Sequence, residues 1–211
     1  MKRSMKSTLM TLAVLGALTV MPAAQGSAIS LTAVNGNLYQ QTIQSPCVFS
    51  NPSCTNGTFP TTDLPTGGNL TGYDQFSQIY SGATILSIIG AGNPLLLGLD
   101  INQASGQPAQ TLTLFTMLKN GVVVDTFSFG GTGNVPAGNN GNGYADFLLG
   151  NFSSFVASDT IQFHFVFNDA NDGTENVFLI GGTGTAVPEP SSWILLGSAL
   201  TGLGLLRRKR S

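Results

Sequence analysis

The chain has 211 residues, of which only 9% are charged, and 27 of them are glycine. Its basic residues lie almost entirely at the two ends: of eight, only Lys119 falls between residues 29 and 186, where nine of the ten acidic residues lie. A body with one cation against nine acids, a net charge of −8, would release few counterions from a polyanion, so this composition excludes nucleic acid as a partner. Low charge and abundant glycine favour an extracellular β protein over a helical cytosolic enzyme.

The N-terminal segment, residues 1–28, has the pattern of a signal peptide. A positively charged beginning, MKRSMK, is followed by the apolar stretch Thr8–Met21, which is too short to span a bilayer comfortably. Pro22 and several small residues come next. We expect cleavage after Ala28, with cleavage after Gly26 as the alternative. The segment predicts export through the Sec translocon and processing by signal peptidase.

The body, residues 29–186, shows recurring strand patterns separated by turn residues and no helical pattern. The predicted strands are residues 29–34, 38–43, 75–80, 84–89, 95–101, 111–118, 122–129, 144–149, 160–167 and 176–180. Its length suits a single hydrophobic core. Many short strands without helices predict an all-β fold, namely a two-sheet antiparallel β-sandwich of jelly-roll-like type, with a barrel as the main alternative. Residues 45–68 and 130–143 read as irregular loops.

Two hairpins are predicted within the body. Asn120 and Gly121 favour the positive φ angles of a tight turn, which would join the strands on either side of them. A second hairpin is predicted to pair residues 161–167 with residues 176–180. In the strand at 160–167, large apolar side chains occupy alternate positions and define a core face: Ile161, Phe163, Phe165 and Phe167.

The only two cysteines, Cys47 and Cys54, are close in sequence. In an exported chain this favours a disulfide bond. Two free thiols or a metal pair are the alternatives, but the chain has one histidine and no further cysteine to complete a metal site.

Candidate catalytic residues are few. His164 is the only histidine, and by alternation with the phenylalanine face it is predicted to point away from the core together with Gln162. A serine triad needs a histidine close to both a nucleophile and an acid, and nothing in the sequence supplies that arrangement. We therefore expect no enzymatic activity.

Two binding functions stay open. The densest group of oxygen-bearing side chains is a weak calcium candidate, although its spacing is not that of an EF-hand and ordinary turn chemistry explains it as well. This group comprises Asp169, Asn171, Asp172 and Glu175. No other cofactor is expected. Polysaccharide binding commonly uses aromatic ring faces, and the body has no tryptophan, only four tyrosines: Tyr39, Tyr73, Tyr80 and Tyr144.

The C-terminal segment, residues 187–211, predicts a single transmembrane helix. Ser191–Leu206 is sixteen residues without a charge, which is about 24 Å of helix against a hydrocarbon core of roughly 30 Å. Trp193 marks one interface, and a basic cluster marks the other, which should stay in the cytoplasm. The cluster consists of Arg207, Arg208, Lys209 and Arg210. The body is therefore predicted to lie outside the inner membrane.

The same segment carries a short motif, Val187-Pro188-Glu189-Pro190, directly before the apolar stretch and its basic end. The two prolines keep Glu189 in extended chain, which a protease can grip. In this order the three parts resemble the PEP-CTERM sorting signal. The resemblance implies exosortase as the processing partner, transient anchoring in the inner membrane, and delivery to the cell surface or the extracellular space. It further implies a Gram-negative bacterium that makes exopolysaccharide or biofilm.

Together these features predict a non-enzymatic, exported protein with a structural or adhesive role in exopolysaccharide or biofilm. The alternative is a polysaccharide- or calcium-binding module on the same β-sandwich scaffold.

Overall fold

The computed structural model describes residues 27–34, 37–50, 54–65, 72–137, 141–170 and 173–181. The predicted signal peptide up to residue 26, the sorting motif and the predicted membrane helix lie outside the described residues. Within those ranges, no helix is long and apolar enough to cross a membrane.

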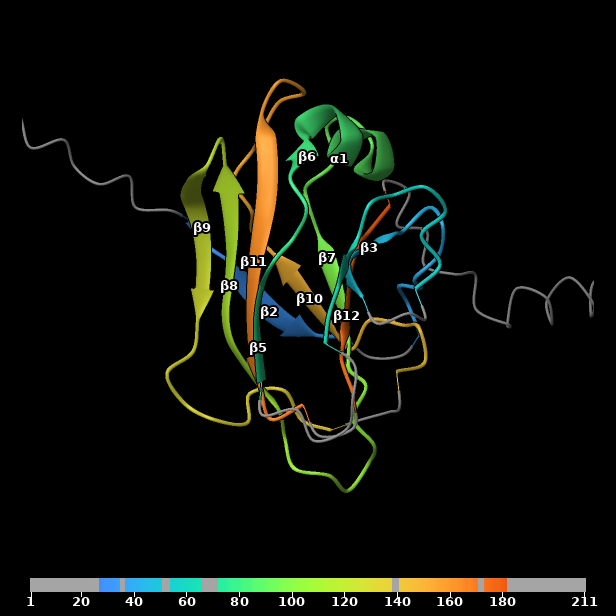
Figure 1. Ribbon diagram of the computed structural model, residues 1–211, viewed down its shortest axis with the longest axis vertical. Coiled ribbons are helices and arrows are strands. Elements are labelled where there is room, and N and C mark those ends of the chain that lie inside the picture. Colours follow the sequence, from blue (N-terminus) through green and yellow to red (C-terminus); the bar gives the residue numbers. More distant parts are fainter. Residues whose placement is uncertain are drawn as a thin grey trace, which may run out of the picture.

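Two six-stranded sheets make up the fold, and we call them sheet I and sheet II (Figure 1). Sheet I runs in the order β1 (Ser27–Ala28), β9 (Val122–Ser128), β8 (Thr111–Lys119), β11 (Thr160–Asn168) and β5 (Gly72–Phe76), with β6 (Tyr80–Ser81) also paired to β11. Sheet II runs in the order β2 (Ser30–Ala33), β10 (Phe147–Gly150), β7 (Leu97–Asp100), β12 (Asn176–Leu179), β3 (Cys47–Ser50) and β4 (Thr62–Asp63). All pairs are antiparallel except the short pairs β1–β9 and β3–β4. The predicted two-sheet β architecture is confirmed.

The core lies between the sheets and is rich in aromatic rings. Along β11 the side chains alternate between buried and partly exposed positions, and the four predicted core residues at 161, 163, 165 and 167 are fully buried. Phe165 contacts Phe49 of sheet II, with ring centroids 5.3 Å apart, and Phe49 also meets Phe115 of β8. These contacts join the two sheets face to face, as in a sandwich.

The hairpin predicted at Asn120-Gly121 is confirmed. Lys119 pairs with Val122, so only two residues form the loop. Asn120 has φ 53° and Gly121 has φ 77°, which are the positive angles that a tight two-residue hairpin requires. Asn120 also fixes the neighbouring loop, because its side chain donates to Asp159 Oδ1 at 2.8 Å.

The second predicted hairpin is wrong. β11 pairs with β8, β5 and β6 in sheet I, whereas β12 pairs with β7 and β3 in sheet II. The segment between them therefore crosses from one sheet to the other. Both strands are apolar enough to be central, and each finds partners that are distant in sequence.

The strand predicted over residues 84–89 is also wrong, because this segment forms the helix α1 (Gly82–Ile89), next to β6 at one end of the sandwich (Figure 1). Ser81 caps the helix: its side chain accepts a hydrogen bond from Thr84 N at 3.1 Å. Ile85 and Ile89 are buried one turn apart, and the helix ends at Gly90, which has φ 83°. An apolar run rich in isoleucine has the composition of a strand, and the strand prediction did not take the Ser81 cap into account.

Residues 45–68, predicted to be irregular, supply two strands of sheet II, β3 and β4. The predicted disulfide between Cys47 and Cys54 is confirmed, and it ties the first residue of β3 to the loop that follows. Residues 38–43, predicted as a strand, form only isolated bridges at Gln40 and Thr42. Within residues 38–43, Tyr39 packs against the outer face of sheet II.

A second apolar cluster forms on that outer face, where Cys47, Ala145, Phe178 and Ile180 are buried together. Phe178 lies opposite Gly98 of β7. A Cβ atom at position 98 would lie 2.6 Å from the Phe178 ring, so the glycine makes room for the aromatic side chain. Sheet II is thus buried on both faces at its centre, whereas sheet I has one core face and one outer face.

The N-terminal strand β1 bears on the predicted processing site. Ala28 lies beside Thr126, its carbonyl accepts from Asn151 Nδ2 at 2.7 Å, and Ile29 N donates to Thr126 O at 3.0 Å. Of the two cleavage positions that the sequence allows, cleavage after Gly26 retains this strand, and cleavage after Ala28 removes it.

Candidate functional site

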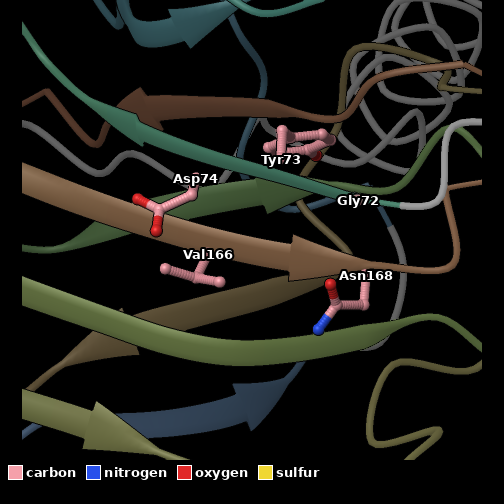
Figure 2. Close-up of a pocket in the computed structure, with 5 residues that line it drawn as sticks. All are labelled: Gly72, Tyr73, Asp74, Val166 and Asn168. Atoms are coloured by element: carbon pink, nitrogen blue, oxygen red, sulfur yellow. The ribbon is translucent and has the colours of Figure 1, made fainter.

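The outer face of sheet I carries an uncommon pairing of polar and aromatic side chains where the edge strand β5 meets β11. Their register places His164 opposite Phe76, Val166 opposite Asp74, and Asn168 opposite Gly72. Because alternate residues of a strand point to opposite faces, these six positions share the outer face, while Tyr73 points into the core. Figure 2 shows Tyr73 leaving β5 on the opposite side from Asp74.

His164 is held by two neighbours. Its Nε2 lies 2.5 Å from Asp74 Oδ1, and its ring stacks on the ring of Phe76 with centroids 4.1 Å apart and an interplanar angle of 6°. The His164 side chain is only 16% exposed, whereas that of Asp74 is 68% exposed. The histidine thus orients the carboxylate and covers one face of Phe76, a residue that is 49% exposed.

Beside this pair lies a shallow depression of about 270 Å³ (Figure 2). It is lined by Gly72, Tyr73, Asp74, Val166 and Asn168. The absence of a side chain at Gly72 is required, since a Cβ atom there would lie 2.6 Å from the backbone oxygen of Phe167 and 2.4 Å from the amide oxygen of Asn168. Asn168 is fixed in turn by donating to Thr113 Oγ1 at 2.7 Å.

The arrangement suits recognition better than catalysis. Asp74 and Asn168 present hydrogen-bonding groups at the rim of an open depression, next to an aromatic ring with an apolar face. Among the described residues, no hydroxyl or thiol group is hydrogen-bonded to the His164 ring, so the contacts of this ring are not those of a nucleophile–base pair. The outward orientation predicted for His164 is confirmed.

The tyrosines singled out from the sequence are not the aromatic surface. Tyr73 and Tyr80 are buried in the core at 6% and 2% exposure, and Tyr39 and Tyr144 are half-buried. Sequence patterns did not identify Phe76 and Asp74 as candidate functional residues. The only signal for them is that they are two residues apart in an otherwise polar strand, which does not reveal that β11 lies alongside.

The residues of the predicted calcium group go to different places. Glu175 is fully buried and accepts a hydrogen bond from Tyr73 at 2.9 Å, whereas Asp169 accepts one from Thr111 at 3.2 Å. Asn171 and Asp172 lie outside the described residues. In the described part of the chain, no three histidine, cysteine or acidic side chains come together to hold a metal ion.

The environment of Glu175 is electrostatically unusual. Burial raises the pKa of this carboxyl to about 7, although hydrogen bonding from Tyr73 and then from Gln110 acts in the opposite direction. Its Oε1 atom accepts no hydrogen bond within the part of the chain that the structure describes. Burial, followed by the Glu175 charge, raises the pKa of the Tyr73 hydroxyl well above its usual value. Burial therefore favours the state of the Tyr73–Glu175 pair in which both groups are protonated and uncharged.

Comparison with known families matches one part of the chain. The family model described as the PEP-CTERM protein-sorting motif matches residues 186–210, which include the Pro188-Glu189-Pro190 tripeptide and the basic end. The chain carries a PEP-CTERM sorting motif. No curated protein and no solved structure matches the chain at a significant level.

The PEP-CTERM motif implies an exported protein, with exosortase as its processing partner and a C-terminal membrane-anchoring region. The body is a disulfide-bonded β-sandwich on a chain whose motif implies processing to the cell surface.

Proposed function

We propose that the β-sandwich is a non-enzymatic structural or adhesive protein of the cell surface or extracellular matrix, embedded in exopolysaccharide or biofilm. The observation that carries the proposal is the PEP-CTERM motif at residues 186–210 on a chain whose body is a two-sheet sandwich. The Cys47–Cys54 disulfide supports it, because such bonds persist in oxidising compartments outside the cytosol. The body also has nine acidic residues and one basic residue, and a net charge of this size favours solubility in such a matrix.

Sorting is tested by replacing the tripeptide with alanines (Pro188→Ala, Glu189→Ala and Pro190→Ala) in the full chain. We expect the variant to stay full-length in the membrane fraction, while the wild type appears at the surface or in the medium without its tail. Intact-mass analysis of each fraction measures this. The matched control replaces Ser191 and Ser192 with alanine and is expected to be processed normally.

The matrix role is tested in the same strains. Cells making the wild type or the serine control should form a cohesive matrix, and cells making the alanine variant should not. A surface protein that retains its C-terminal end would contradict exosortase processing. A matrix that is equally cohesive without the protein would contradict the structural role. Turnover of a glycan that one carboxylate substitution abolishes would contradict the absence of enzymatic activity.

A second candidate function, polysaccharide binding, is favoured by the face around Phe76. Sugar rings bind through apolar contact with an aromatic face together with hydrogen bonds from amides and carboxylates. Phe76, Asp74 and Asn168 offer such groups on one face of the β5–β11 pair. A long, flat polymer suits an open sheet face better than an enclosed cavity.

We expect Phe76→Ala to weaken retention on exopolysaccharide purified from the producing cells at least about tenfold, which corresponds to about 1.4 kcal/mol. Affinity electrophoresis in gels containing the polymer measures it. The control, Val122→Ala, removes an apolar side chain that is even more exposed, at 64%, from the far strand β9. Equal retention of both variants and the wild type would exclude this face as the binding site.

A further inference from the structure

A second, unrelated polar site lies in sheet II around Asp100, the last residue of β7. Asp100 is fully buried. Its neighbours Leu99 and Ile101 belong to the core between the sheets, so by alternation its side chain leaves the sheet on the outer face. There the loop at residues 141–144 covers it, with Gly143 N donating to Asp100 Oδ2 at 3.0 Å.

The second carboxylate oxygen of Asp100, Oδ1, is buried and accepts no hydrogen bond from the described residues. Burial raises the pKa of this carboxyl to about 6, and the negative charge of Asp146 acts in the same direction, against hydrogen bonds from Gly143 and Asn176. A buried carboxylate with a bare oxygen is costly unless a cation or a proton completes its environment.

Two other oxygen-bearing side chains lie near Asp100, since the charge of Asp146 and a hydrogen bond from Asn176 both act on its carboxyl. Asp146 follows the covering loop, and its Oδ2 accepts from Ile101 N at 2.8 Å, next to Asp100 in the chain. Asn176 of β12 is directly opposite Asp100 in the sheet register and is 5% exposed. Lys119, the one basic residue of the body, donates to Ser154 O instead, in the loop that follows β10. No lysine or arginine within the described ranges therefore balances the two carboxylates.

We propose that Asp100, Asp146 and Asn176 form a binding site for a calcium ion on the outer face of sheet II. Hard oxygen ligands from carboxylates and an amide are those that Ca²⁺ prefers, and the ion takes six to eight of them. The three side chains supply part of this number, and water supplies the rest. The ion neutralises both carboxylates and ties β7, β12 and the covering loop together.

The site differs from the group around residues 169–175 that the sequence singles out, and it stands independently of the proposed matrix role. Export matters only for whether a calcium ion occupies the site. Extracellular modules bind Ca²⁺ with dissociation constants on the order of 10⁻⁴–10⁻³ M, so a site with two carboxylates can fill outside the cell.

The test measures the melting temperature of the full-length protein in detergent, in EDTA and in 10 mM CaCl₂ at constant ionic strength and pH 7.5. We expect Ca²⁺ to raise Tm of the wild type by about 5 °C and Mg²⁺ to raise it much less. The shift should disappear in Asp100→Asn and persist in the control Asp159→Asn, which removes an exposed carboxylate hydrogen-bonded to Asn120. Equilibrium dialysis of the wild type against radioactive calcium should give one ion per chain.

The second measurement needs no variant, so it decides the matter if Asp100→Asn does not fold. Absence of bound calcium in dialysis would overturn the proposal. An equal calcium shift in Asp100→Asn and the wild type would overturn it as well. A stabilisation on acidification to pH 5 that Asp100→Asn abolishes, without any response to calcium, would assign a proton to Asp100 in place of the ion.

Discussion

Replacing Phe165 with alanine is expected to lower the free energy of unfolding by about 3–5 kcal/mol. The Phe165 ring is fully buried and lies within 5.3–5.8 Å, centroid to centroid, of four other rings: Phe49, Tyr73, Phe115 and Phe167. Phe49 belongs to sheet II and the others to sheet I, so the cavity would open at the junction of the two layers. Denaturant unfolding followed by circular dichroism measures the loss.

The matched control is Phe76→Ala, which removes the same side chain from a position that is 49% exposed. Its cost should stay below about 1 kcal/mol. If the two variants lose similar stability, the two sheets are not joined through Phe165, and the described packing of the sandwich is incorrect.

Glu175→Gln is expected to remove most of the dependence of stability on pH between pH 4.5 and 7. Burial raises the pKa of this carboxyl from 4.5 to about 7, so the folded state binds its proton more tightly than the unfolded state. The stabilisation is therefore complete below pH 4.5 and is lost as pH rises through 7. The loss amounts to about 3 kcal/mol for the wild type. Denaturant unfolding at several pH values, in EDTA, measures it.

Asp100 contributes in the same direction between pH 3.8 and 6, so a smaller slope should remain in the glutamine variant. The control is Asp159→Asn. Hydrogen bonding from Val156 N and Asn120 lowers the pKa of the Asp159 carboxyl below 3.8, so this substitution should leave the slope between pH 4.5 and 7 unchanged. A wild-type protein that gains stability as the pH rises through this range would show that Glu175 is not in the environment described.

Local sequence signals predicted two local features of this fold, the tight hairpin after β8 and the core face of β11. The Asn120-Gly121 pair specifies its hairpin through φ angles alone, and the alternation along β11 depends only on which side chains are large and apolar. The cap at Ser81 was also readable, since Thr84 follows at the spacing of a helix start, but the isoleucines of α1 outweighed it. Residue type and spacing decide such features.

Pairings between segments that are distant in sequence could not be predicted from residue type and spacing. β12 is equally apolar whichever sheet it enters, and its partners β7 and β3 are known only from the folded chain. The same holds for the candidate site, because Asp74 and His164 are 90 residues apart in sequence and meet through the β5–β11 register. The sorting motif was predictable in full, since its parts are contiguous and are read as linear sequence.

The position of β12 has a mechanical consequence. This strand is followed by the last described residues, Ile180 and Gly181, and it is hydrogen-bonded to β7 on one side and β3 on the other. Tension transmitted from a tethered C-terminus would therefore pull on an interior strand of sheet II, and both flanking ladders would have to give way before it could be extracted. A protein held against flow by its C-terminal end is attached at one of its most resistant points.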